Sequence, residues 1–297
     1  AALCAEPSAG ALDDTCARWR EALVSFRATA TYGIGPAMRD GLSAELAFFP
    51  TRPSSIEANL ASGAPITDSW IAELGAAGTG LFAIEYLLFP QPGAADDTLD
   101  VLVADPRRCE YAAGLAHHAA EEAGAVRLAW SSEGEGFADD FASGVGGNSV
   151  LMSALATQMV SALQLLKLTE LGKPLGLSDG GTPQLDDVEA RLARHSVAAM
   201  RATLAGVVAA WGTGSDSLAA LVRARRPDLA TRFDDALAAA DAALAIIEEP
   251  FDEHLSGGAE LDALAAHAAV REAERLLASE IASALGVMVS LTDSDGD

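Results

Sequence analysis

The sequence predicts an all-α protein made of two packed helical bundles. Half of the 297 residues are apolar but only 5% are aromatic, so alanine and leucine supply most of the hydrophobic surface. Alanine has the highest helix propensity and lets helix backbones approach closely. Extended runs of Val, Ile and Thr are nearly absent, and the chain is long enough for two domains of ordinary size.

The first part of the chain is predicted to hold one well-defined helix followed by short ones. Residues 13–32 carry apolar side chains at helical spacing and end where two glycines and Pro36 stop the hydrogen-bond ladder. Residues 38–55 are expected to be irregular. Short helices are expected at residues 56–61, 67–74 and 80–89, the last closed by a Pro-Gln-Pro-Gly sequence.

The remaining helices are predicted to be longer. Asp105 as N-cap and Pro106 at the first helical position open a helix that runs to Trp130. The Gly-, Ser- and acid-rich residues that follow predict a boundary between a first bundle, residues 1–140, and a second, residues 148–297. Helices in the second bundle are expected at residues 149–171, 188–211, 217–225, 227–247 and 260–285.

Charge and hydropathy narrow the range of partners. The chain has 43 Asp and Glu against 19 Lys and Arg, for a formal net charge of -24. Such a surface repels phosphate groups, so we expect neither nucleic acid nor anionic membranes as partners. No uninterrupted run of about 18 apolar residues is visible, so we expect no membrane span. The first residues read like the end of a helix without an initiator Met, so we expect a processed chain.

The three cysteines predict one disulfide. Cys4, Cys16 and Cys109 are widely separated and lack Cys-x-x-Cys spacing, so a zinc site built on thiolates is not expected. In an exported protein one disulfide and one spare thiol would be ordinary, and we expect the pair Cys4–Cys109. The alternative is three buried thiols that pack as small hydrophobic groups.

One carboxylate stands out because of its neighbours. The sequence Gly-Leu-Phe-Ala-Ile-Glu-Tyr-Leu-Leu-Phe from Gly80 to Phe89 places Glu85 among apolar residues. On a helix Glu85 would share a face with Phe82 and Leu88. A charge there must be paired, hydrogen-bonded or neutralised, because burying it alone costs several kcal/mol. The alternative is a carboxylate at a helix end that reaches water.

Two other groups of residues could bind a metal ion. His118 and Glu122 lie one helical turn apart and continue a stripe with Tyr111 and Leu115, so one helix could supply two ligands. A solvated helix face is the alternative. The acidic C-terminal residues resemble the first half of a calcium loop but lack the downstream Glu, so a standard EF-hand is excluded. An acidic tail is the alternative there.

Several segments, in the same order and over nearly the whole chain, resemble the imelysin family, the helical periplasmic proteins of bacterial iron acquisition. They are the helix with Trp19 that ends in Gly35-Pro36, Phe49-Pro50, residues 80–89, residues 105–111, residues 172–176 and residues 285–297. The resemblance implies a two-bundle fold, export to the periplasm or envelope, and a site in a cleft between the bundles.

The resemblance also implies which residues would form that site. The Gly-x-His-x-x-Glu signature of the family, once proposed to supply metallopeptidase ligands, falls on Gly80, Phe82 and Glu85, with Phe82 at the histidine position. Phenylalanine cannot coordinate a metal, so the change disfavours metal catalysis. The candidate ligand-binding residues are Gly80, Phe82, Glu85, Gly35, Pro36, Asp295 and Asp297.

These observations leave three functional hypotheses. The first is a non-catalytic binding or accessory protein that holds iron, haem or a small ligand, with another envelope protein as a further partner. Iron or another divalent metal would be its cofactor. The second is a metallopeptidase-like hydrolase with Glu85 as base and His118 and Glu122 as metal ligands. The third is a structural module that presents a helical surface to a partner.

Overall fold

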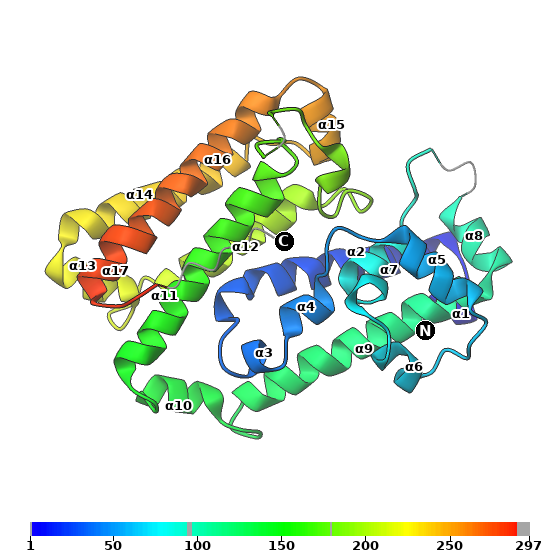
Figure 1. Ribbon diagram of the computed structural model, residues 1–297, viewed down its shortest axis with the longest axis horizontal. Helices are drawn as coiled ribbons and strands as arrows, with labels where there is room; N and C mark the ends of the chain where they lie inside the picture. Colours follow the sequence, from blue (N-terminus) through cyan, green and yellow to red (C-terminus); the bar gives the residue numbers. More distant parts are fainter. Residues whose placement is uncertain (1, 94–96, 179, 290–297) are drawn as a thin grey trace. The chain divides into compact units, whose positions relative to one another are not determined.

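The all-α prediction is confirmed. The computed structural model describes residues 2–93, 97–178 and 180–289, and every regular element within these ranges is a helix (Figure 1). The chain divides into two compact units. Unit 1 comprises Ala1–Leu23 and Gly35–Phe137, and unit 2 comprises Val24–Ile34 and Ala138–Asp297.

We expected two domains that follow one another in the chain, but the two units do not. Helix α2 (Ala9–Ala28) begins in unit 1, but residues 24–34 pack with unit 2. Gly206 permits this packing, because a Cβ atom there would lie 2.4 Å from the backbone oxygen of Ala28. The hydroxyl of Thr31 donates to the Gly206 carbonyl at 3.2 Å, which fixes the segment on the same turn of α12 (Ser196–Trp211).

Unit 1 is organised around the long helix α9 (Pro106–Trp130). Its other elements are α1 (Ala2–Ala5), the first part of α2, α3 (Pro36–Arg39), α4 (Leu42–Leu46), α5 (Pro53–Ala61), α6 (Asp68–Ala72), the 3-10 turn η2 (Ala76–Gly78), α7 (Gly80–Leu88) and α8 (Thr98–Ala104). Asp105 caps α9 as expected, since its Oδ1 accepts from Arg107 N at 3.2 Å.

The predicted disulfide is confirmed. Cys4 on α1 is bonded to Cys109 on α9, with the two Cα atoms 5.6 Å apart and a sequence separation of 105. The third cysteine, Cys16, is a buried free thiol. Because the bond closes a loop that contains most of unit 1, it restricts the unfolded chain strongly.

Unit 2 buries a second and larger core between long helices. Its elements are the end of α2, η1 (Ala30–Tyr32), α10 (Phe137–Ser143), α11 (Asn148–Gln164), η3 (Leu165–Gly172), η4 (Leu185–Asp187), α12, α13 (Leu218–Arg225), α14 (Pro227–Leu244), α15 (Phe251–Ser256), α16 (Glu260–Arg275), η5 (Leu276–Ile281) and α17 (Ala282–Leu285). The elements η3 and η5 are π-helices that continue α11 and α16. Met159, Leu166 and Phe233 are among the side chains fully buried between these helices.

The helix formed by α11 and η3 has an unexpected composition. Over Asn148–Gly172 it is long and apolar enough to cross a membrane, the one such helix in the described ranges. Its few charged side chains interrupt the apolar run, so the helix does not stand out as an uninterrupted apolar segment in the sequence. Several of its side chains, including Met159, Leu163 and Leu166, belong to the core of unit 2.

One expected helix starts late. We expected a helix over residues 188–211, but α12 begins only at Ser196. Ala190 and Arg194 adopt left-handed backbone angles, with φ of 53° and 52°. Such angles interrupt a right-handed helix and are costly for residues other than glycine. The loop before α12 therefore has a conformation that is maintained by its surroundings, which include the buried side chain of Glu189.

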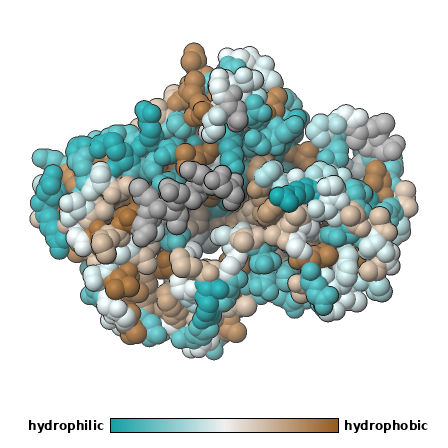
Figure 2. All heavy atoms as spheres, viewed as in Figure 1, coloured by the Kyte–Doolittle hydropathy of each residue, from teal (hydrophilic) through white to brown (hydrophobic). Residues whose placement is uncertain are grey.

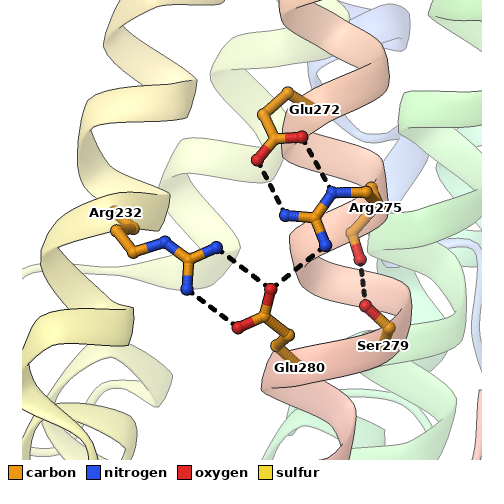
Figure 3. A network of polar contacts seen from close by, with 5 residues as sticks. All are labelled: Arg232, Glu272, Arg275, Ser279 and Glu280. Atoms are coloured by element: carbon orange, nitrogen blue, oxygen red, sulfur yellow. Dashed lines mark hydrogen bonds and ion pairs between the residues drawn. The ribbon is translucent and has the colours of Figure 1, made fainter.

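The surface is rich in charge, as the composition predicts. Figure 2 shows hydrophilic residues interspersed with neutral and hydrophobic ones on the face that it presents. A network on α14, α16 and η5 is one example (Figure 3). Arg232 and Arg275 both donate to Glu280, at 2.8 and 3.1 Å, and their hydrogen bonds lower the pKa of this exposed carboxyl to about 2.

Candidate functional site

Helix α7 carries the signature residues at the centre of unit 1. Every residue of this helix except Tyr86 is buried. The indole Nε1 of Trp19 donates to the Leu81 carbonyl at 2.8 Å, and the Cys16 thiol lies 3.6 Å from the Leu88 carbonyl. Because α2 contacts both ends of α7 through these groups, α7 is fixed in position by side chains from a distant part of the chain.

Gly80 begins α7 in a conformation that suits only glycine. Its φ is +79°, and a Cβ atom there would lie 2.8 Å from the backbone oxygens of both Glu45 and Leu46. Side chains strongly disfavour positive φ, and backbone atoms cannot move aside as a flexible side chain can. The glycine of the signature is therefore required for the close packing of α7 against α4.

We expect Gly80→Ala to destabilise unit 1 by about 2–4 kcal/mol, from the left-handed backbone and the clash together. Gly41 offers a matched control, since its φ is +66° but no atom lies within 4 Å of the position of a Cβ. Gly41→Ala should cost only about 1–2 kcal/mol from the backbone conformation. Denaturant unfolding of the two variants measures the difference, and equal losses would contradict the clash.

Phe82 is a core residue. Its side chain is 1% exposed, and its ring packs edge-to-face on Phe49 with the ring centroids 5.1 Å apart. Aromatic pairs in this geometry add roughly 0.5–1.5 kcal/mol beyond the burial of area. The position that the family signature gives to histidine is thus filled by a hydrocarbon ring that stabilises unit 1.

Glu85 is buried, which is one of the two alternatives that its apolar neighbours left open. It is 3% exposed and lies one turn after Phe82 on the same helix. The alternative of a carboxylate that reaches water is therefore wrong. The next residue, Tyr86, is bound to α5, since the Tyr86 hydroxyl donates to Glu57 Oε1 at 2.9 Å. Arg108 also binds Glu57, through Nη1 at 3.0 Å.

Gly35 and Pro36 begin α3 in the same unit. Gly35 has a φ of +53°, and a Cβ atom there would lie 2.3 Å from the ring of Phe137. Pro36 is buried at the first position of α3. Phe137 in turn packs edge-to-face on Trp130 at 4.9 Å. These contacts give both residues a packing role, and their role in ligand binding stays a prediction.

The two metal-ligand candidates on α9 are only half-buried. Tyr111 and Leu115 are fully buried, whereas His118 and Glu122 lie at the edge of the same stripe. Neighbouring His117 lies 3.4 Å from Glu121 on an exposed face. Across the described ranges, no group of three or more His, Cys, Asp or Glu side chains is arranged to hold a metal ion. Asp295 and Asp297 lie outside the residues that the structure describes.

Unit 2 contains a buried charged cluster that the sequence did not predict. Arg27 at the end of α2 is 4% exposed, Glu170 on η3 is 2% exposed and Glu189 before α12 is 6% exposed. Arg27 Nη2 donates to Glu189 Oε2, and Arg27 Nε lies 3.3 Å from Glu170 Oε1. We call these three residues the buried triad. One guanidinium therefore faces two carboxylates where water is excluded.

Polar side chains of α12 complete the surroundings of the triad. The Thr203 hydroxyl lies 3.3 Å from Glu170 Oε1, and the Ser196 hydroxyl donates to the backbone oxygen of Glu189 at 2.6 Å. Burial raises the pKa of Glu170 to about 7, an effect that Arg27 opposes and Glu189 reinforces. A carboxyl with such a pKa titrates near neutral pH.

Unit 2 also has a surface pocket of about 340 Å³ close to the start of α12. It is lined by Glu248, Glu249, Pro250, Glu253, His254, Gly257 and Ala259. Glu249 Oε1 accepts from Val197 N at 2.6 Å, so this carboxylate caps the N-terminus of α12. None of the residues predicted for the site lines this pocket.

Comparison with known proteins decides the family. The family model described as Imelysin matches residues 1–278. The chain belongs to the imelysin family. A search of the curated proteins finds no match for this family member.

Two solved structures share the imelysin fold. An iron-regulated protein A precursor from Parabacteroides distasonis has a TM-score of 0.80 and 18% identity, over 95% of this chain and 86% of that one. An imelysin-like protein from Psychrobacter arcticum has a TM-score of 0.65 and 16% identity, over 97% of this chain and 86% of that one. At these identities the likeness concerns the fold.

The buried triad of this imelysin-family protein had only an indirect signal in its sequence. Glu170 lies among leucines but also beside Lys167 and Thr169, and Arg27 follows Ser25-Phe26, so neither is set off by an apolar stretch as Glu85 is. Nothing local indicates that the two would meet. The residues of the signature segment, in contrast, are adjacent in sequence and form a local pattern.

Proposed function

We propose that this protein is a binding or accessory component of bacterial iron or haem acquisition, exported to the periplasm or held at the envelope. The observation that carries the proposal is the replacement of the signature histidine by Phe82, a ring packed in the core of unit 1. A side chain without a lone pair cannot bind a metal, so this position contributes nothing to a metal-activated water. A binding role does not need such a water.

Three further observations support the proposal. The relative from Parabacteroides distasonis is named an iron-regulated protein precursor. The disulfide between Cys4 and Cys109 is typical of proteins in oxidising compartments. The net charge of -24 favours the approach of cations.

Glu85 is the residue to test first, because it keeps the position of the signature glutamate. We expect ferric iron, ferrous iron or haem to bind the full chain with a Kd of about 1 μM or tighter. Glu85→Gln should weaken that binding at least about tenfold, which corresponds to about 1.4 kcal/mol. Glu110→Gln, an exposed change on α9 in the same unit, should leave the affinity unchanged. Isothermal titration calorimetry measures all three proteins.

The same experiment separates the other hypotheses. Absence of heat with all three ligands would overturn the binding role and favour a structural interaction module. Hydrolysis of peptides that depends on added metal and on Glu85 would instead support a metallopeptidase-like hydrolase, the activity for which the family model is named.

A further inference from the structure

The buried triad has more negative than positive charge if both of its carboxyls are ionised. Arg27 supplies one positive charge to Glu170 and Glu189, and the three residues are 4%, 2% and 6% exposed. A buried charge without a counter-charge costs several kcal/mol, and such a group takes up a proton instead when it can. The triad is neutral only when one of the two carboxyls is protonated.

The hydrogen bonds indicate which carboxyl holds the proton. Glu170 Oε2 is buried and has no hydrogen-bond partner in the part of the chain that the structure describes. Glu189, in contrast, accepts directly from Arg27 Nη2. A carboxylate normally has several acceptor positions filled when it is buried as an anion. Glu170 is therefore the less well satisfied anion of the two.

Thr203 supports the same assignment. Its hydroxyl lies 3.2 Å from the Ala199 carbonyl and 3.3 Å from Glu170 Oε1. A hydroxyl has one proton, so it can donate to only one of these two acceptors. If Glu170 carries a proton on Oε1, it can donate to Thr203 while Thr203 donates to Ala199. Thr203 and Glu170 Oε1 then each have a partner of the right kind, and the unpartnered Oε2 no longer carries a negative charge.

We infer that the buried triad is a proton-sensitive anchor for residues 24–34, firm when Glu170 is protonated and weakened when Glu170 and Glu189 are both charged. Residues 24–34 contribute Arg27 to the triad. Thr31 holds the same segment to Gly206 by a hydrogen bond that involves no titratable group. The charged groups that act on Glu170 are Arg27 and Glu189. Lys167 on the same π-helix is paired with Glu274 of α16.

The direction of the pH effect follows from the folded and unfolded states. Burial raises the pKa of Glu170 from an ordinary value of 4.5 to about 7 in the folded protein. The folded state therefore binds more protons than the unfolded state between about pH 4.5 and 7. The contribution of Glu170 to stability is greatest below this window and is lost as the pH rises through it.

The test compares the unfolding of unit 2 in the full chain at pH 5 and pH 8. In the wild type, loss of the contribution of Glu170 should make the unfolding equilibrium constant larger at pH 8 than at pH 5, on the order of 100-fold. Glu170→Gln mimics the protonated acid, so it should lack this contribution and be more stable than the wild type at pH 8. Glu280→Gln is the matched control, since the exposed Glu280 has a pKa of about 2 and stays ionised throughout.

Two direct measurements on the wild type keep the inference testable if Glu170→Gln does not fold. Infrared spectroscopy should detect a protonated carboxylic acid near pH 6 that disappears toward pH 8. Hydrogen exchange of residues 24–28, corrected for the intrinsic effect of pH, should be faster at pH 8 than at pH 5. The same pH dependence in wild type and Glu170→Gln, or no protonated acid at pH 6, would overturn the anchor.

Discussion

Arg27→Met is expected to destabilise unit 2 by about 3–5 kcal/mol, the largest effect of any single change proposed for this protein. The change removes the only positive charge that the triad contains and leaves two carboxyls buried without it. The lost side chain also holds residues 24–34 to unit 2. Denaturant unfolding, monitored by the hydrogen exchange of amides in α12 and η3, measures the loss of stability.

Arg201→Met provides the control for Arg27→Met. Arg201 lies on α12 and donates to Asp241 at 2.9 Å, but both side chains are about half exposed. An exposed ion pair contributes about 0–1 kcal/mol, so this change should have little effect. Combining Arg27→Met with Glu170→Gln and Glu189→Gln should recover part of the loss, because no buried charge then remains. A loss below about 1 kcal/mol for Arg27→Met alone would contradict the role of the triad.

Removal of the disulfide is expected to have an effect of similar size on unit 1. Cys4→Ser combined with Cys109→Ser should destabilise unit 1 by about 3–5 kcal/mol, because the bond joins residues with a sequence separation of 105. The reason is the greater freedom of the unfolded chain, since α1 and α9 can keep their contacts in the folded state. Denaturant unfolding under oxidising conditions measures the change.

Reduction of the wild type gives an independent measure of the same bond. A reductant should lower the stability of the wild type to that of the double variant and should leave the double variant unchanged. Cys16→Ala tests whether the free thiol contributes, and it should not alter the response to reductant. If reduction leaves the wild type unchanged, the disulfide does not stabilise unit 1.

The features that could be predicted from the sequence are those that depend on residues close together in the chain. Asp105 and Pro106 marked the start of α9 because capping acts over a few residues. Glu85 could be singled out because its apolar neighbours are adjacent in the chain, although the choice between burial and exposure stayed open until the structure was known. The Cys4–Cys109 pair could be predicted because only three cysteines are present and an exported protein was expected.

Features that depend on distant residues could not be predicted in this way. Arg27 and Glu189 are 162 residues apart in the chain, and neither has a local pattern that identifies the other. The late start of α12 depends on the left-handed residues Ala190 and Arg194, which helix propensity alone does not forbid. The ligand, if Glu85 contacts one, also stays a prediction, because the signature identifies the family more clearly than the chemistry.

The path of α2 has a consequence for how this protein could be divided. Residues 24–34 belong to unit 2 although they lie inside the sequence of unit 1. A cut in the loop between α9 and α10, residues 131–136, would leave the C-terminal fragment with Glu170 and Glu189 but without Arg27. The N-terminal fragment would carry residues 24–34 without the helices of unit 2 against which they pack. The buried triad of unit 2 thus includes a residue that the chain supplies more than one hundred residues earlier, so we expect the two fragments to be complementary halves rather than independent domains.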